Sequence, residues 1–151
     1  KRSLIKQKAE DLKNEFGESP VVIGWSLGGI YALNIFQEDK KLFKRVITLA
    51  SPLSSEFSKN SAILMKGIYS IVARNTDDLD KVIVDNFKTR NQDKVVVIGA
   101  ERDGLVDYKT CISPYLKSYI VDCYHMNVAS HPHTLDIIKK EISFQGPSRL
   151  L

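Results

Sequence analysis

The chain has 151 residues, of which 43% are hydrophobic and 26% are charged, and its formal net charge is +4. This length and composition are typical of one globular domain with a hydrophobic core of its own. Lysines and arginines are interleaved with acidic residues, so the modest positive charge does not predict a nucleic-acid groove. No apolar run approaches membrane-spanning length and no signal peptide is visible, so a cytoplasmic location is the default expectation.

The pattern of elements alternates between helices and strands. Residues 4–16 predict an amphipathic helix that stops at Gly17, and residues 20–23 are a Val-rich apolar run that predicts a strand buried on both faces. Helical spacing returns at residues 27–36. Further strands are predicted at residues 45–49, 93–98 and 118–121, and a last helix at residues 133–143. This alternation predicts an α/β fold with a parallel sheet flanked by helices.

A long segment without strand signals separates the second and third predicted strands. Residues 53–92 contain two helical patterns, and the first is apolar over a wide arc. One interpretation is a helix packed on the sheet, and the alternative is a cap whose Met-bearing face would receive an acyl chain. We expect a single domain over residues 1–143, with residues 53–92 as a helical insertion. Residues 144–151 resemble a protease-site linker and are set aside.

One short motif stands out directly after the first predicted strand. Residues Gly24 to Gly28 read Gly-Trp-Ser-Leu-Gly and fit the pattern G-x-S-x-G, which Gly29 extends. In this pattern a serine sits on a very tight turn between a strand and a helix, where only small neighbours two positions away avoid a collision. The same geometry points the backbone N–H of Leu27 at a carbonyl oxygen under attack by Ser26, and the helix N-terminus favours negative charge there. Ser26 is therefore a candidate nucleophile.

Two other interpretations of these glycines are an ordinary turn and a phosphate-binding loop. A phosphate loop would need either a Lys-Ser/Thr ending or the spacing G-x-G-x-x-G, and the three glycines fit neither. The apolar strand before the motif and the amphipathic helix after it favour the nucleophile over a plain turn.

The candidate acids follow the third predicted strand. Asp103 lies in a turn past the carboxyl end of that strand, at the edge of a parallel sheet where active sites collect. Glu101 is closer to the strand and could also reach inward. Asp107 precedes a short predicted helix at residues 108–112, where an N-cap is its expected role. We favour Asp103 as the acid that orients the base.

All three histidines lie near the end of the chain. His125 follows the fourth predicted strand, where a loop can bring its imidazole over Ser26. A serine hydroxyl needs such a base, and the base needs an orienting carboxylate. His131 and His133 lie at the start of the last helix, where a capping or surface role is expected. His125 is therefore the favoured base.

The cysteines and the acidic residues do not predict a metal site. Cys111 and Cys123 have neither zinc-site spacing nor the density of a disulfide scaffold, so reduced thiols are expected. The histidines and aspartates lack a regular short spacing on one element. Catalysis by serine, histidine and aspartate needs no cofactor, and none is expected.

Together these motifs resemble an α/β-hydrolase, and the resemblance covers residues 4–143. It rests on Gly24–Gly29, on Ile-Thr-Leu-Ala-Ser-Pro at residues 47–52, on Arg-Asp-Gly-Leu-Val-Asp at residues 102–107, and on His125 followed by His-Pro at residues 131–132. Within the superfamily the chain is most similar to bacterial lipase- or esterase-like hydrolases. The resemblance implies Ser26 as nucleophile, Asp103 as acid, His125 as base and the Leu27 N–H as an oxyanion donor.

The chain departs from this pattern before the motif. Such hydrolases have several strands ahead of the serine, whereas only one helix precedes the first strand here. The second oxyanion donor normally comes from a loop after an early strand, and nothing in residues 1–20 can supply it. The first strand would show a bare apolar edge, open to pairing with another chain. We therefore expect a fragment of a larger hydrolase, or a half that a partner or a second copy completes.

The expected function is hydrolysis of small-molecule or lipid esters through an acyl-enzyme on Ser26. Acyl transfer to an acceptor other than water and thioester cleavage share this chemistry, so they stay open. A third alternative, of a different class, is a non-catalytic hydrolase-like subunit that binds a partner through its open sheet edge.

Overall fold

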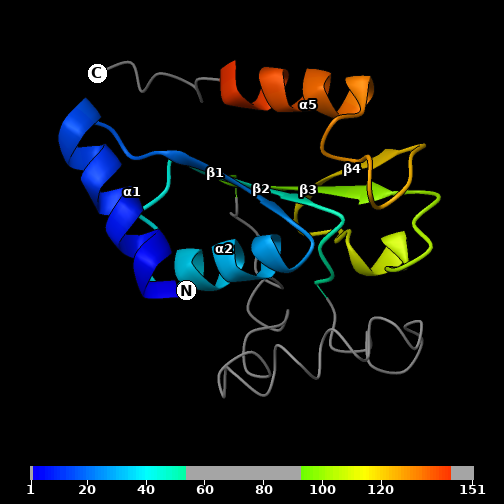
Figure 1. Cartoon of the computed structure of the whole chain (residues 1–151), viewed down its shortest axis with the longest axis horizontal. Coiled ribbons are helices and arrows are strands. Elements are labelled where there is room, and N and C mark those ends of the chain that lie inside the picture. The colour runs from blue at the N-terminus through cyan, green and yellow to red at the C-terminus, as the bar shows by residue number, and fades with distance from the viewer. Residues whose placement is uncertain (1, 54–92, 144–151) are drawn as a thin grey trace.

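The computed structural model describes residues 2–53 and 93–143 of the chain. Its elements are α1 (Arg2–Phe16), β1 (Val21–Trp25), α2 (Leu27–Glu38), β2 (Arg45–Leu49), β3 (Val95–Ala100), the short 3₁₀ helix η3 (Tyr108–Thr110), β4 (Lys117–Val121) and α5 (Pro132–Ser143) (Figure 1). All of them were predicted, and no boundary differs by more than two residues. The insertion from residue 54 onward and the tail at residues 144–151 lie outside the described residues.

The four described strands form one parallel sheet in the order β1-β2-β3-β4. Val22 pairs with Val46, and Thr48 pairs with Val97, so neighbouring strands are in close register. In Figure 1, α2 lies below this sheet and α5 lies above it. The predicted α/β architecture is therefore confirmed. Within the described ranges, no helix has both the length and the apolar character needed to cross a membrane.

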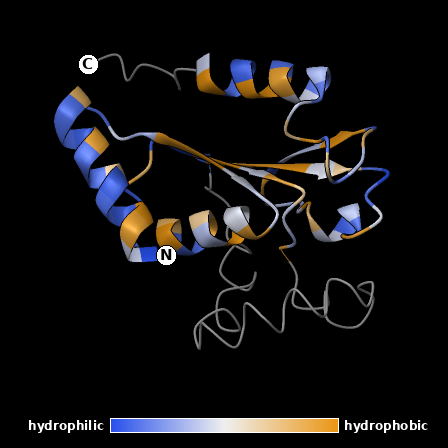
Figure 2. Cartoon of the chain, in the orientation of Figure 1, coloured by the Kyte–Doolittle hydropathy of each residue, from blue (hydrophilic) through white to orange (hydrophobic). Residues whose placement is uncertain are grey.

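The core has one layer on each face of the sheet. Successive side chains of a strand point to opposite faces, so Val46 of β2 packs toward α2 and Ile47 packs toward α5. The first layer joins Leu33, Ile35 and Phe36 to Val46, Val95 and Val97. The second joins Ile137, Ile138 and Val128 to Ile47, Val96, Ile98 and Val121. Because β2 and β3 are covered on both sides, their sequences are nearly continuous apolar runs (Figure 2).

The prediction that the first strand is buried on both faces is wrong. Ile23 and Trp25 of β1 are 45% and 40% exposed, because β1 is an outer strand of the described sheet. Outer strand β4 is also largely exposed. The bare apolar edge expected of the first strand is present in the part of the chain that the structure describes.

A buried ionic cluster fastens α5 to the amino ends of the strands. Glu141 is fully buried, and its carboxylate accepts from Arg45 Nη1, Lys117 Nζ and Tyr119 Oη, each at 2.6 Å. Burial alone would raise the pKa of Glu141, but the hydrogen bonds from Lys117 and Tyr119, with the charges of Lys117 and Arg45, hold it below its ordinary value. The sequence analysis did not identify this cluster, whose members come from three separate elements.

Candidate active site

Ser26 occupies a strained turn between β1 and α2. Its φ of 52° and ψ of −121° are unusual for a residue with a side chain, which indicates a conformation imposed by its surroundings. The Ser26 N–H donates to the carbonyl of Leu49 at 2.8 Å, and its own carbonyl accepts from Gly29 at 3.1 Å. The turn is thus tied to the carboxyl end of β2 on one side and to the first turn of α2 on the other.

Two glycines make this turn possible by allowing the backbones to approach. A Cβ on Gly24 would lie 2.5 Å from Gly29 Cα, and a Cβ on Gly29 would lie 2.1 Å from Ser51 Oγ. A Cβ on Gly28 would have no neighbour within 4 Å among the described residues. The expected clearance is therefore found at Gly24, but its counterpart is Gly29 rather than Gly28, because Gly29 faces the strand and Ser51.

Ser51 links the turn to the neighbouring strand end. It is fully buried, and its hydroxyl donates at 3.2 Å to the Leu49 carbonyl that also accepts from Ser26. Ala50 between them has a φ of 48°, which makes it the other non-glycine residue with positive φ in the described ranges. Strain is thus concentrated at the carboxyl ends of β1 and β2.

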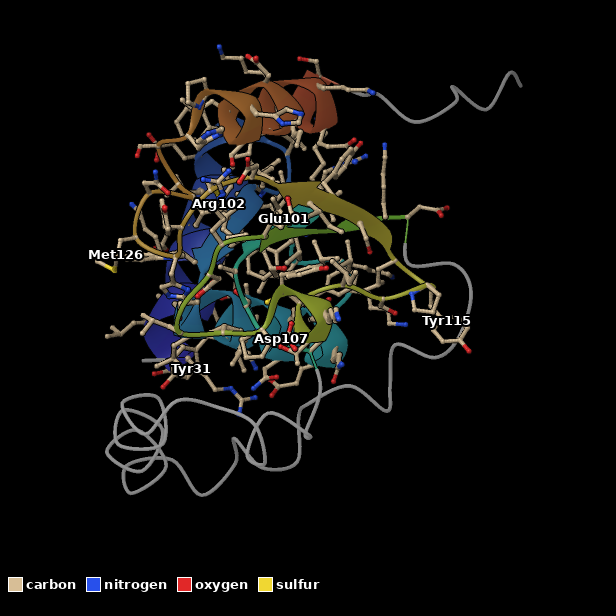
Figure 3. The ribbon with its side chains drawn as sticks, turned by 90° about the vertical axis from the view of Figure 1, so that its right-hand side faces the viewer. Tyr31, Glu101, Arg102, Asp107, Tyr115 and Met126 are labelled. Carbon is tan, nitrogen blue, oxygen red and sulfur yellow. The ribbon has the colours of Figure 1, made fainter. Side chains whose placement is uncertain are left out.

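Asp103 lies in the loop after β3, with its side chain 1% exposed. Its Oδ1 accepts from the backbone N–H groups of Leu105 and Val106, each at 2.8 Å, which fixes the carboxylate within its own turn. The alternative acid, Glu101, is exposed on the same loop (Figure 3). Asp107 accepts from the N–H of Lys109 at 3.0 Å and caps η3, as predicted.

His125 meets Asp103 at the same edge of the sheet. His125 Nδ1 lies 2.6 Å from Asp103 Oδ2, and the imidazole is 6% exposed. A carboxylate that is ionised can only accept, so with such a partner Nδ1 carries the proton, and the lone pair of a neutral ring is then on Nε2. This tautomer is the one a general base needs if it is to take a proton through Nε2.

The loop that carries His125 is held by its own turns. The side chain of Asn127 accepts from the Tyr124 N–H at 2.9 Å, and Val128 anchors the loop in the core. At the base of the loop the Arg102 N–H donates to the Cys123 carbonyl at 3.0 Å, which joins it to the loop of the acid. Met126 is exposed and points away from the molecule (Figure 3).

Trp25, the residue before Ser26, contacts the His125 loop directly. Its indole Nε1–H donates to the backbone carbonyl of His125 at 3.1 Å, and the two rings lie 5.5 Å apart at 41°. No hydrogen bond joins Ser26 Oγ to His125 within the described residues. The structure thus brings Asp103 and His125 together and places the serine strand against them through Trp25. The sequence analysis missed Trp25, although it is the chain's single tryptophan and lies inside the motif.

A protein-family model matches residues 1–143. The chain belongs to the uncharacterised protein family UPF0227. No curated protein matches the chain at a significant level.

Solved structures share the fold of this UPF0227 member at low identity. A thermophilic esterase is 17% identical with a TM-score of 0.59, covering 92% of this chain and 71% of its own. The Bacillus licheniformis lipase BlEst2 is 15% identical with a TM-score of 0.60, covering 95% and 73%. The N-acyl homoserine lactonase AidH is 14% identical with a TM-score of 0.60, covering 97% and 72%. The fold is that of a partial α/β-hydrolase, as the resemblance implied, and esterases, lipases and a lactonase are among its structural neighbours.

The remaining predicted residues have the following places. Leu27 begins α2, so its N–H has no partner within the helix. The His131 carbonyl accepts from Leu135 at 3.0 Å, in line with the expected role at the start of α5.

Both cysteines are buried free thiols. Burial raises the pKa of Cys111 to about 12 and also raises that of Cys123, and the nearby charge of Asp103 adds to both shifts. Both thiols are therefore neutral and poorly nucleophilic at neutral pH. No group of three or more histidine, cysteine, aspartate or glutamate residues in the described ranges is arranged to hold a metal ion.

Proposed function

We propose that this UPF0227 member is a serine hydrolase that cleaves carboxylic esters of small molecules or lipids through an acyl-enzyme. In this proposal Ser26 is the nucleophile, His125 the general base and Asp103 the residue that orients it. The observation that supports it best is the buried 2.6 Å pair of Asp103 and His125 at the sheet edge where the strained Ser26 turn lies. Esterase and lipase names among the structural neighbours are in keeping with this reaction.

The proposed reaction moves one proton between two residues. His125 Nε2 takes the Ser26 hydroxyl proton as Oγ attacks the ester carbonyl, and the imidazolium that forms is stabilised by Asp103 Oδ2. His125 then gives the proton to the leaving alcohol, and water repeats the sequence to release the acid. The Asp103 carboxylate keeps its position throughout, because the N–H groups of Leu105 and Val106 hold its other oxygen.

The developing oxyanion needs donors, and in this proposal the first turn of α2 provides one. The Leu27 N–H starts a helix of 12 residues and has no helical acceptor, so we assign it this role. Loss of one oxyanion donor typically costs about 100- to 1000-fold in rate. Full hydrolytic activity is therefore expected to need a second oxyanion donor from outside the described residues.

A fluorophosphonate probe, together with hydrolysis of a short-chain p-nitrophenyl ester, tests the proposal. Wild-type protein should be labelled at Ser26, and Ser26→Ala should lose both the label and the hydrolysis. Ser130→Ala is the matched control, because Ser130 is an exposed serine in the His125 loop, and it should behave as wild type. Absence of labelling in the folded, full-length product of the gene would refute the proposal.

The same assay separates hydrolysis from the alternatives that share its chemistry. An added alcohol or thiol would divert the acyl group into a new ester or thioester if transfer competes with water. Free acid as the sole product supports the hydrolase, whereas preferential transfer would replace it with an acyltransferase.

A second candidate function, a non-catalytic subunit, is favoured by the exposed edge of β1. Ile23 and Trp25 present apolar surface on a strand that has a neighbour on one side only within the described sheet, which is a site for pairing with another chain. Light scattering of the purified protein tests this candidate. An inactive complex of two or more chains would support it, and an active monomer would exclude it.

A further inference from the structure

We propose that Trp25 is a positioning residue that locks the His125 loop onto the strand leading to Ser26; this inference rests on the proposed function. Trp25 is 40% exposed, which is unusual for a large aromatic residue in a strand, and yet its one polar atom has a partner. The indole N–H is the only donor of that side chain, and it donates to the backbone carbonyl of His125. The contact spans 100 residues of sequence.

Asp103 alone does not fix the imidazole. Its hydrogen bond holds Nδ1 at one point, but a ring held at one nitrogen can still swing about that contact and carry Nε2 away from Ser26. A second constraint on the backbone or the ring is needed to set the direction of Nε2. Trp25 provides both, because its N–H fixes the His125 backbone and its ring packs against the imidazole at 5.5 Å.

The other anchors of the His125 loop do not connect it to the serine. Asn127 ties the loop to itself, Val128 ties it to the core under α5, and the Arg102 N–H ties it to the acid loop. Among the described residues, the Trp25 bond is the single hydrogen bond between β1 and this loop. Base and nucleophile strand are therefore linked directly through Trp25.

The ring contact also bears on the charged state of the base. When His125 has taken the serine proton, its imidazolium lies beside the indole within the distance at which a cation is attracted to an aromatic face. Asp103 then stabilises the cation on one side and Trp25 on another. The tryptophan thus acts through His125 and needs no contact with the substrate.

Trp25→Phe tests this inference, because it keeps an aromatic ring and removes the N–H. Ile23→Ala is the matched control, since Ile23 lies on the same face of β1 and has similar exposure, and its apolar side chain can make neither a hydrogen bond nor a ring contact with His125. We expect Trp25→Phe to lower kcat roughly tenfold, with KM changed by less than about twofold, as when one positioning hydrogen bond is lost. Ile23→Ala should leave both constants as in wild type.

A proton NMR measurement adds a readout that does not depend on catalysis. The His125 Nδ1–H that is shared with Asp103 should give a low-field resonance, and its exchange with solvent should be faster in Trp25→Phe than in wild type or Ile23→Ala. In wild-type protein the single indole Nε1–H should itself exchange slowly. A fast-exchanging indole proton would overturn the inference even if Trp25→Phe failed to fold.

The outcomes distinguish this inference from the proposed function. If wild-type protein is neither labelled nor active, the proposed function fails, and the two exchange rates still decide whether Trp25 holds the His125 loop. If wild type is active while Trp25→Phe matches it in kcat and in exchange, Trp25 has no positioning role and only this inference is overturned.

Discussion

Two buried carboxylates lie at opposite ends of the strands of the same sheet, and they bind different kinds of partner. Asp103, past the carboxyl end of β3, is bound by two backbone N–H groups and one histidine. Glu141 of α5 reaches the amino ends of the strands, where it is bound by an arginine, a lysine and a tyrosine. Both side chains are almost completely inaccessible to solvent.

The difference lies in whether the partner's charge can change. Arg45 and Lys117 are cationic at any physiological pH, so Glu141 is in a permanent ion pair that fixes α5 to the sheet. His125 can be neutral or cationic, so the Asp103 pair can respond when a proton arrives. The Glu141 cluster therefore keeps its charges, whereas in the proposed reaction the charge of His125 changes. We expect substitutions at the two carboxylates to separate catalysis from stability.

The largest expected effect is on catalysis at Asp103. Asp103→Asn can offer an amide N–H to His125 Nδ1, which would force the ring proton onto Nε2 and remove the acceptor for the serine proton. A change of this kind lowers kcat by about 10⁴-fold in serine hydrolases with this arrangement. Ester hydrolysis and the rate of fluorophosphonate labelling measure it.

Asp107→Asn is the matched control for that substitution. Asp107 is a carboxylate four positions along the chain whose side chain caps η3, and asparagine is an equally good cap. Its kcat should stay near wild type. If Asp103→Asn retained wild-type kcat, Asp103 would have only a structural role, like Glu141.

A smaller but still large effect is expected on stability at Glu141. Glu141→Gln removes the buried negative charge that pairs with Arg45 and Lys117, which costs about 3 kcal/mol of the free energy of unfolding. Urea unfolding measures this, while kcat under folding conditions should change little because the cluster lies at the far edge of the sheet. Asp136→Asn, at an exposed carboxylate of the same helix, should leave stability within about 0.5 kcal/mol of wild type. Equal stability of Glu141→Gln and wild type would contradict the idea that the Glu141 cluster fixes α5 to the sheet.

Much of the fold could be predicted because its signals are local. The apolar runs of β2 and β3, the helical stripes of α1, α2 and α5, and the turn residues between them all lie within short windows of sequence. What failed was the burial of β1, because residues 21–23 look the same in an inner strand and in an outer one whose side chains meet solvent. Burial depends on neighbours that the window does not contain.

The same reasoning explains which parts of the site were found. Asp103 and His125 follow adjacent parallel strands, so topology alone brings their loops to one edge, and their predicted proximity is confirmed by the 2.6 Å contact. The contact of Trp25 with His125 and that of Glu141 with Arg45 were missed, because they join residues 100 and 96 positions apart and neither contact has a motif. The catalytic roles of Ser26, Asp103 and His125 stay predictions until the labelling experiment is done.

The smallest expected effect is the contribution of Glu141 to the pH dependence of the free energy of unfolding. Because the pKa of Glu141 is held below its ordinary value in the folded protein, the unfolded chain takes up a proton first as the pH falls. Glu141 therefore contributes stability above the ordinary glutamate pKa, and that contribution is lost as the pH drops through the lowered value. Urea unfolding from about pH 7 to about pH 2 should show wild type losing stability more steeply than Glu141→Gln below the ordinary glutamate pKa, so that the two curves converge at acid pH. Parallel curves would mean that Glu141 does not titrate differently on folding, and that the cations around it only balance the cost of its burial.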